Sequence, residues 1–238
     1  PVSHSLSEKY FTDKFILEGI EARYERFLLK DIHSLPQILS AYPELKGLSV
    51  TSPFKESVID YCDELCETSK EIRAVNTLKI SREGGKVNIK GYNTDVDGFA
   101  AALIPLIGNN KPDTLILGSG GAARAVAHAL NKLGIKFMVV SRSPGMSKIG
   151  YAELDESHIK SHQLIINATP LGMKHHTGES PEIPYHLLTS GHILFDLIYN
   201  PAETPFLQKG RQHRARIENG MIMLQAQAEK AWKIWTGK

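Results

Sequence analysis

Runs of apolar residues separated by short polar turns divide the second half of the chain into strands and helices. Residues 115–117 form an apolar run after Pro112-Asp113, which predicts a buried strand. From Ala123 to Leu133 apolar residues recur at helical spacing, and Gly134 stands where a helix usually ends. Further buried strands and a long last helix are expected at residues 137–140, 164–169, 193–196 and 221–235. This alternation indicates an α/β fold with a parallel sheet.

The first half of the chain also alternates between strands and helices, and it adds a hairpin. Helices are expected at residues 8–17, 35–40, 55–65 and 96–106, and strands near residues 23–28 and at residues 47–50. Ser7 is a plausible N-cap for the first of these helices. The pair Gly84-Gly85, between apolar runs at residues 75–80 and 87–90, is typical of a β-hairpin turn.

The turn after the strand at residues 115–117 has the sequence Gly118-Ser119-Gly120-Gly121-Ala122-Ala123. Its first, third and sixth residues match the dinucleotide-binding fingerprint G-x-G-x-x-G/A. The first glycine permits a tight turn, and the second lets the backbone approach a pyrophosphate. The free N–H groups at the start of the helix then face the phosphates. A plain strand–loop–helix without a ligand is the alternative, but both flanking elements fit the dinucleotide site.

The end of the next strand indicates which dinucleotide is bound. NAD enzymes usually place Asp or Glu there to hold the ribose hydroxyls. This chain has Ser141-Arg142-Ser143 instead, and an arginine between two hydroxyls binds a 2′-phosphate that a carboxylate would repel. The sequence therefore favours NADP, with a merely solvated charge at Arg142 as the alternative.

The composition argues against several classes of protein: those that bind nucleic acid, those that bind or cross membranes, and those that hold a metal. The 28 Lys and Arg residues against 26 Asp and Glu give a net charge of +2, too small to argue for nucleic acid or an anionic membrane. No apolar run reaches the ~20 residues of a membrane span, and no signal-peptide pattern occurs, so a cytoplasmic protein is expected. Cys62 and Cys66 are expected to be reduced thiols on a helix. The histidines lack metal-binding spacing, so no metal is predicted.

Short motifs along essentially the whole chain resemble those of the shikimate dehydrogenases, in the order of that family. They are Ser3-His4-Ser5-Leu6-Ser7, Val50-Thr51-Ser52-Pro53-Phe54-Lys55-Glu56, Ala74-Val75-Asn76-Thr77, Gly91-Tyr92-Asn93-Thr94-Asp95, the glycine turn, Asn167-Ala168-Thr169-Pro170-Leu171-Gly172 and Asp196-Leu197-Ile198-Tyr199, followed by Gly220 and Gln227. Each motif alone is common, but the ordered set is specific.

The resemblance implies reversible, NADPH-dependent reduction of 3-dehydroshikimate to shikimate, a step of chorismate and aromatic amino acid biosynthesis. It implies that Lys55 and Asp95 are the catalytic pair for proton transfer. The substrate contacts that it implies are Ser5, Ser7, Thr51, Lys55, Asn76, Asp95, Tyr199 and Gln227. The NADP contacts that it implies are Gly118, Ser119, Gly120, Gly121, Ala122, Ser141, Arg142, Leu197 and Gly220. Taken alone, a lysine is more often a solvated charge, and Ser7 or Asp95 a helix cap.

The resemblance also implies two lobes with a cleft between them. Residues 1–97 with 218–238 are expected to form a three-layer α/β substrate domain, and residues 98–217 a doubly wound, Rossmann-like NADP domain. The first residues are typical of a loop that follows a strand, so a short strand is expected ahead of them. The protein is expected to act on a small molecule as a monomer or homodimer, without nucleic-acid or membrane partners.

Two other functions stay open. One is an NAD-dependent quinate/shikimate dehydrogenase, which Arg142 and the lack of an acid at Ser141 disfavour. The other is a non-catalytic sensor of a dinucleotide or small acid, which the presence of both Lys55 and Asp95 disfavours. The chain departs from the family at Ser141, where an amide is usual and a hydroxyl can still donate to phosphate. It also departs at Ser52, where an apolar residue is common.

Overall fold

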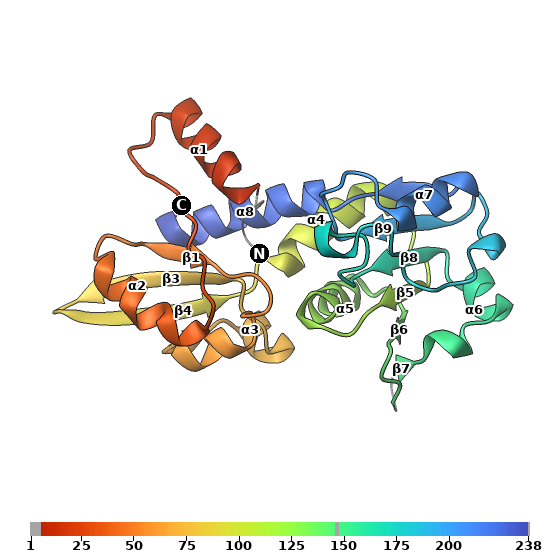
Figure 1. Cartoon of the computed structure of the whole chain (residues 1–238), viewed down its shortest axis with the longest axis horizontal. Helices are drawn as coiled ribbons and strands as arrows, with labels where there is room; N and C mark the ends of the chain where they lie inside the picture. The colour runs from red at the N-terminus through yellow and green to blue at the C-terminus, as the bar shows by residue number, and fades with distance from the viewer. Residues whose placement is uncertain (1–5, 146–147, 238) are drawn as a thin grey trace.

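A computed structural model of the chain describes residues 6–145 and 148–237, and it contains two sheets in two lobes (Figure 1). The lobe built from the second half of the sequence holds a six-stranded sheet in the order β10-β9-β8-β5-β6-β7. The strands are β5 (Thr114–Leu117), β6 (Phe137–Val140), β7 (Lys148–Ile149), β8 (Leu164–Asn167), β9 (Ile193–Asp196) and β10 (Arg216–Glu218). Every pairing is parallel, and the order matches that of a Rossmann fold, which confirms the predicted fold class.

Helices cover both faces of this sheet because its strands are apolar on both sides. The helices of this lobe are α5 (Gly121–Leu133), α6 (Glu156–Ser161) and α7 (Pro205–Gln212), with single 3₁₀ turns at Tyr151–Glu153, Lys174–His176 and Tyr185–Leu187. All four residues of β5 and of β8 are buried. One apolar cluster joins α5 to the sheet and a second joins α6 and α7 to it.

The other lobe has a four-stranded sheet in the order β1-β3-β4-β2. Its strands are β1 (Gly47–Ser49), β2 (Glu64–Leu65), β3 (Thr77–Glu83) and β4 (Lys86–Tyr92), and the predicted hairpin is the β3–β4 pair. The 3₁₀ helix Ile32–Ser34 with α2 (Leu35–Ala41), a second 3₁₀ helix (Ser57–Tyr61) and α3 (Glu67–Ile72) complete this part. Leu35, Val58 and Leu78 belong to the apolar cluster that α2 forms with the sheet.

Two helices join the lobes, α4 (Asp95–Ile107) and α8 (Met221–Thr236). They pack closely against each other at Gly98, where an added Cβ would lie 2.7 Å from the carbonyl oxygen of Met223. In Figure 1, α8 starts between the lobes and lies along the four-stranded sheet, where Trp235 donates to the carbonyl of Leu78 over 2.9 Å. No helix among the described residues is both long and apolar enough to cross a bilayer.

Four local expectations were wrong. Residues 23–28 form no strand: Tyr24 instead stacks on Phe11 of α1 (Ser7–Glu18) at 4.7 Å, and Arg26 pairs with Glu8 over 2.6 Å. Ser7 is the first residue of α1 rather than its cap, since Leu6 holds the cap position.

The helix expected at residues 55–65 is only the 3₁₀ helix Ser57–Tyr61. It stops at Cys62 because the next residues pair with β4: the Asp63 N–H donates to the carbonyl of Ile89, and the Asp63 carboxylate accepts from the Ile89 N–H. Tertiary pairing with β4 thus overrides the helical spacing. Cys62 and Cys66 are free thiols on either side of β2 and lie outside any α-helix.

Candidate active site

The predicted site residues line one cavity of about 2990 Å³ between the two lobes. The members found there are Ser7, Thr51, Lys55, Asn76, Asp95, Gly118, Ser119, Gly120, Gly121, Ala122, Ser141, Arg142, Leu197, Tyr199, Gly220 and Gln227. Ser5 lies outside the described residues. The cavity borders the carboxyl ends of β5, β6, β8 and β9, where parallel sheets bind their ligands.

Lys55 and Asp95 form a close ion pair within this cavity. The Nζ atom of Lys55 donates to Oδ2 of Asp95 over 2.7 Å, and the two side chains are only 17% and 9% exposed. Lys55 lies in the turn before the 3₁₀ helix of the first lobe, and Asp95 is the first residue of α4. An amine held by a carboxylate at the edge of a cavity is suited to move a proton to or from a bound group.

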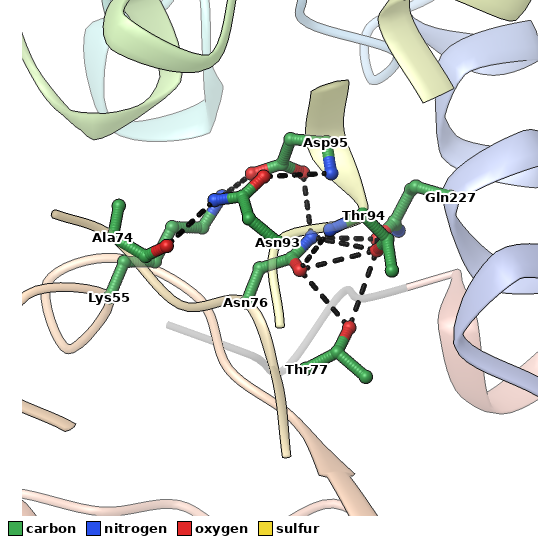
Figure 2. A network of polar contacts seen from close by, with 8 residues as sticks. All are labelled: Lys55, Ala74, Asn76, Thr77, Asn93, Thr94, Asp95 and Gln227. Carbon is green, nitrogen blue, oxygen red and sulfur yellow. Dashed lines mark hydrogen bonds and ion pairs between the residues drawn. The ribbon is translucent and has the colours of Figure 1, made fainter. Parts of the chain in front are cut away.

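Asn76 connects the carboxylate to the rest of the polar network (Figure 2). Its Nδ2 atom lies 2.9 Å from Oδ1 of Asp95, 3.0 Å from the hydroxyl of Thr94 and 3.2 Å from Oε1 of Gln227. Its Oδ1 atom accepts from the Thr94 N–H over 2.8 Å. Asn76 is 3% exposed, so these bonds replace water and hold the amide in one orientation.

Thr94 is a residue of this network to which the sequence assigned no role. Its side chain is fully buried, and its hydroxyl also lies 3.3 Å from both Thr77 and Gln227. The available signal was its position between Asn93 and Asp95 in a run of polar residues that enters a helix. Gln227, from α8, thereby joins the wall of the cavity that carries Asn76 and Asp95.

The glycine turn has the shape needed for a dinucleotide. Gly118 has φ +109°, a conformation that side chains rarely adopt, and it packs against the backbone of Ala168. At Gly120 an added Cβ would meet nothing within 4 Å, so the backbone is open toward the cavity that it lines. Gly120 caps α5 without any side-chain bond to the first N–H groups of that helix. This cradle fits a pyrophosphate.

Ser141 and Arg142 follow β6 beside this turn. The Ser141 hydroxyl lies 3.1 Å from the Ser119 hydroxyl and accepts from the Ser143 N–H over 3.2 Å. Arg142 is exposed at the cavity edge, close enough to Tyr151 to oppose the rise that burial causes in the pKa of that phenol. Ser119, Ser141 and Arg142 therefore line the same cavity, and their hydroxyls and guanidinium are groups suited to bind a phosphate.

The loop after β9 brings Leu197 and Tyr199 to the cavity. Asp196, at the end of β9, is fully buried and accepts from Asn167, from the Ile198 N–H and, over 2.5 Å, from Thr204. Burial raises the pKa of this carboxyl to about 6. The sequence assigns Asp196 no role of its own, yet its bonds shape the loop.

Gly220 and Tyr199 fix the remaining edge of this loop. An added Cβ at Gly220 would lie 2.1 Å from the carbonyl oxygen of Leu197, so the start of α8 touches the loop backbone directly. The Tyr199 hydroxyl lies close enough to the backbone of Leu6 for that backbone to oppose the rise that burial causes in the pKa of this phenol. The loop thus links α8 to the start of α1, next to Ser7.

Within residues 6–145 and 148–237, no group of three or more His, Cys, Asp and Glu side chains is placed to hold a metal ion.

Comparison with known proteins identifies relatives over the full length of the chain. Residues 1–78 match the family model of the shikimate dehydrogenase substrate binding domain. The shikimate dehydrogenase (NADP(+)) of Aquifex aeolicus is 37% identical over 248 residues, which span 100% of this chain and 88% of the relative.

Two solved structures are also similar. The Thermus thermophilus shikimate 5-dehydrogenase in complex with NADP(H) and shikimate has a TM-score of 0.86 at 30% identity, covering 100% of this chain and 91% of that one. Quinate dehydrogenase from Corynebacterium glutamicum in complex with NAD has a TM-score of 0.84 at 26% identity, with 100% and 91% covered.

Proposed function

This chain belongs to the shikimate dehydrogenase family, and we propose that it catalyses the reversible, NADPH-dependent reduction of 3-dehydroshikimate to shikimate. The observation that carries this proposal is the Lys55–Asp95 pair, which lines the same cavity as the glycine turn. Hydride transfer to a ketone requires a proton donor beside the carbonyl and a dinucleotide cradle within reach of it. The two lobes supply one each.

Lys55 carries the proton in this proposal. During reduction its ammonium group donates to the ketone oxygen as negative charge develops there, and during oxidation the neutral amine takes the alcohol proton. Asp95 orients the amine and offers its carboxylate to the same hydroxyl of the substrate. When bound, NADP(H) supplies or accepts the hydride. Apart from Lys55 and Asp95, the residues drawn in Figure 2 have no ionisable side chain that could carry the proton.

The polar groups that line the cavity suit a small acid with several hydroxyls. Ser7, Thr51, Asn76, Tyr199 and Gln227 all line the cavity, and we propose that they bind the substrate, together with Ser5. Hydroxyl and amide groups can each donate and accept, as recognition of a polyhydroxylated ring requires. The proposed NADP contacts are the glycine turn with Ser141, Arg142, Leu197 and Gly220.

One comparison of rates tests this function. The purified chain is given shikimate with NADP⁺, shikimate with NAD⁺, and quinate with each dinucleotide, while reduced dinucleotide is followed by absorbance. The expected result is the highest kcat/KM for shikimate with NADP⁺, by about tenfold or more over the other pairs. A preference for NAD⁺ or quinate would instead favour the quinate/shikimate enzyme. Dinucleotide binding without turnover of either acid would favour a sensor.

We further propose that the boundary between the two lobes lies near residues 97 and 218. The chain then crosses from the first lobe to the second in the first turn of α4, and it returns just before α8. We also propose that the protein acts on a small molecule in the cytoplasm, without nucleic-acid or membrane partners; the net charge of +2 is too low to attract a polyanion. A monomer or a homodimer is the proposed state, and sedimentation analysis of the purified chain measures it directly.

A further inference from the structure

Arg124 lies in the first turns of α5, directly after the dinucleotide cradle, but it is not among the residues that line the cavity. Its guanidinium reaches the other lobe instead. Nε donates to the carbonyl of Ile72 over 2.8 Å, and Nη2 donates to the carbonyl of Arg73 over 3.3 Å. Nη2 also forms an ion pair with Oε1 of Glu56 at 2.8 Å. One side chain therefore bonds two separate segments of the first lobe.

These segments are the ones that carry the proposed proton donor and the network amide. Glu56 follows Lys55, and Ile72-Arg73 lead through Ala74 and Val75 to Asn76. The segments are also bonded to each other, since the Val75 N–H donates to the carbonyl of Lys55 over 2.7 Å. Arg124 thus holds a rigid pair of segments from the outside.

The same place is where the cradle touches the first lobe. An added Cβ at Gly121 would lie 3.6 Å from the Cβ of Ala74, an ordinary van der Waals distance, so the turn and the first lobe come close together here. Arg124 lies three residues after Gly121 on α5, about one helical turn further along. Its planar guanidinium can fix both the distance and the orientation of the backbone groups to which it donates. The carbonyls to which Arg124 donates are at the end of α3, where the helix dipole favours a cation.

We propose that Arg124 is a positioning residue that sets Lys55 and Asn76 in register with the dinucleotide-binding turn. It acts through the backbone of residues 72–73 and through Glu56, and it touches neither substrate nor dinucleotide. Its effect belongs to the chemical step, because hydride donor and proton donor come from different lobes and must meet at one carbonyl. This inference rests on the proposed function.

The test compares Arg124→Met with Arg82→Met as a matched control. Arg82 also donates to three backbone carbonyls, those of Leu39, Tyr42 and Leu45, but entirely within the first lobe. We expect Arg124→Met to lower kcat by about tenfold or more, since small misplacements of reacting groups are costly. The Kd for NADPH, followed by its fluorescence, is expected to change less than about twofold. Arg82→Met is expected to keep kcat within about twofold of the parent.

Arg124→Lys keeps the charge near Glu56 but cannot span two carbonyls, so its kcat is expected to fall between those of the parent and Arg124→Met. Equal losses of kcat in Arg124→Met and Arg82→Met would overturn the proposal in favour of general destabilisation. A loss of NADPH affinity with kcat unchanged would overturn it in favour of a phosphate contact.

Hydrogen exchange separates this proposal from the proposed function. Arg124→Met is expected to speed exchange of the Val75 and Asn76 amides by about tenfold through local opening, whereas Arg82→Met is not. Unchanged exchange at both amides would overturn the positioning role. If the parent chain binds NADPH but turns over no shikimate, the proposed function fails while the exchange result still decides the role of Arg124.

Discussion

The side chain of Lys55 reaches Oδ2 of Asp95 over 2.7 Å, while the other carboxylate oxygen of Asp95 accepts from Asn76 over 2.9 Å. Each oxygen of this carboxylate accepts one bond from the protein, so the carboxylate is held in one orientation and still has acceptor capacity for a bound hydroxyl. The three residues come from the turn after β1, the residue before β3 and the start of α4. Their arrangement exists only because the β3–β4 hairpin brings Asn76 beside Asp95.

Lys55→Met is expected to lower kcat by about 10² to 10⁴-fold, the usual contribution of a positioned acid or base, with a smaller change in KM for shikimate. Methionine keeps most of the apolar stem and removes the amine. Initial rates in both directions measure this. Lys90→Met is the control, because Lys90 forms a similar 2.8 Å ion pair with Glu64 in the same lobe. A kcat near that of the parent in Lys55→Met would refute the assignment.

Arg142→Ala is expected to raise KM for NADP⁺ by about tenfold to a hundredfold, the value of a charge-assisted bond to phosphate, and to leave KM for NAD⁺ nearly unchanged. Steady-state rates with both dinucleotides at saturating shikimate measure the difference. Arg216→Ala serves as control, since Arg216 is on β10, at the far side of the sheet from β6. An equal rise for both dinucleotides would show that Arg142 does not read the 2′-phosphate.

Much of the fold and of the candidate site could be predicted from the sequence. Buried parallel strands are marked by short apolar runs, and their carboxyl ends share one edge of a sheet. The sequence therefore predicts that Gly118 and Ser141 belong to one dinucleotide site. The ordered motifs indicated the family, which the relatives confirm. The individual roles of the site residues stay predictions.

The remainder depended on contacts between distant segments, which spacing along the chain does not encode. Residues 23–28 have a strand-like pattern, but their two aromatic side chains pack elsewhere: Tyr24 stacks on Phe11, and Phe27 packs edge-on against Tyr42. The helix at residues 55–65 is cut short because β4 offers Asp63 a backbone partner. The sequence gives Arg124 no role, because its acceptors lie in a different lobe.

Gly120→Ala is expected to leave the fold intact and to weaken the binding of the dinucleotide. The new methyl group would meet no protein atom within 4 Å, so the melting temperature should stay that of the parent. It would, however, occupy space at the cradle and is expected to raise the Kd for NADPH by about tenfold. Gly191→Ala, an exposed position in the same lobe, is the control. Unchanged NADPH affinity would mean that the pyrophosphate does not bind at Gly120.

Asp196→Asn is expected to change how stability depends on pH. Burial raises the pKa of the Asp196 carboxyl to about 6, whereas an unfolded chain has a value of about 3.9. Between these values the folded protein retains a proton that the unfolded chain has lost. The free energy of unfolding therefore falls as pH rises from about 4 to about 6, by up to about 1.4 kcal/mol per pH unit from this group.

Asparagine cannot titrate, so urea unfolding of Asp196→Asn across this pH range should lack that part of the slope. The substitution is tolerable because Asn167 and the Ile198 N–H can still donate to its carbonyl oxygen. The Thr204 hydroxyl, which donates to Oδ2 in the parent, can turn and accept from the new amide. Asp97→Asn, an exposed carboxylate on α4, is expected to keep the slope of the parent. Parallel pH curves for Asp196→Asn and the parent would show that burial does not perturb Asp196, and that its three donors hold the carboxylate ionised throughout.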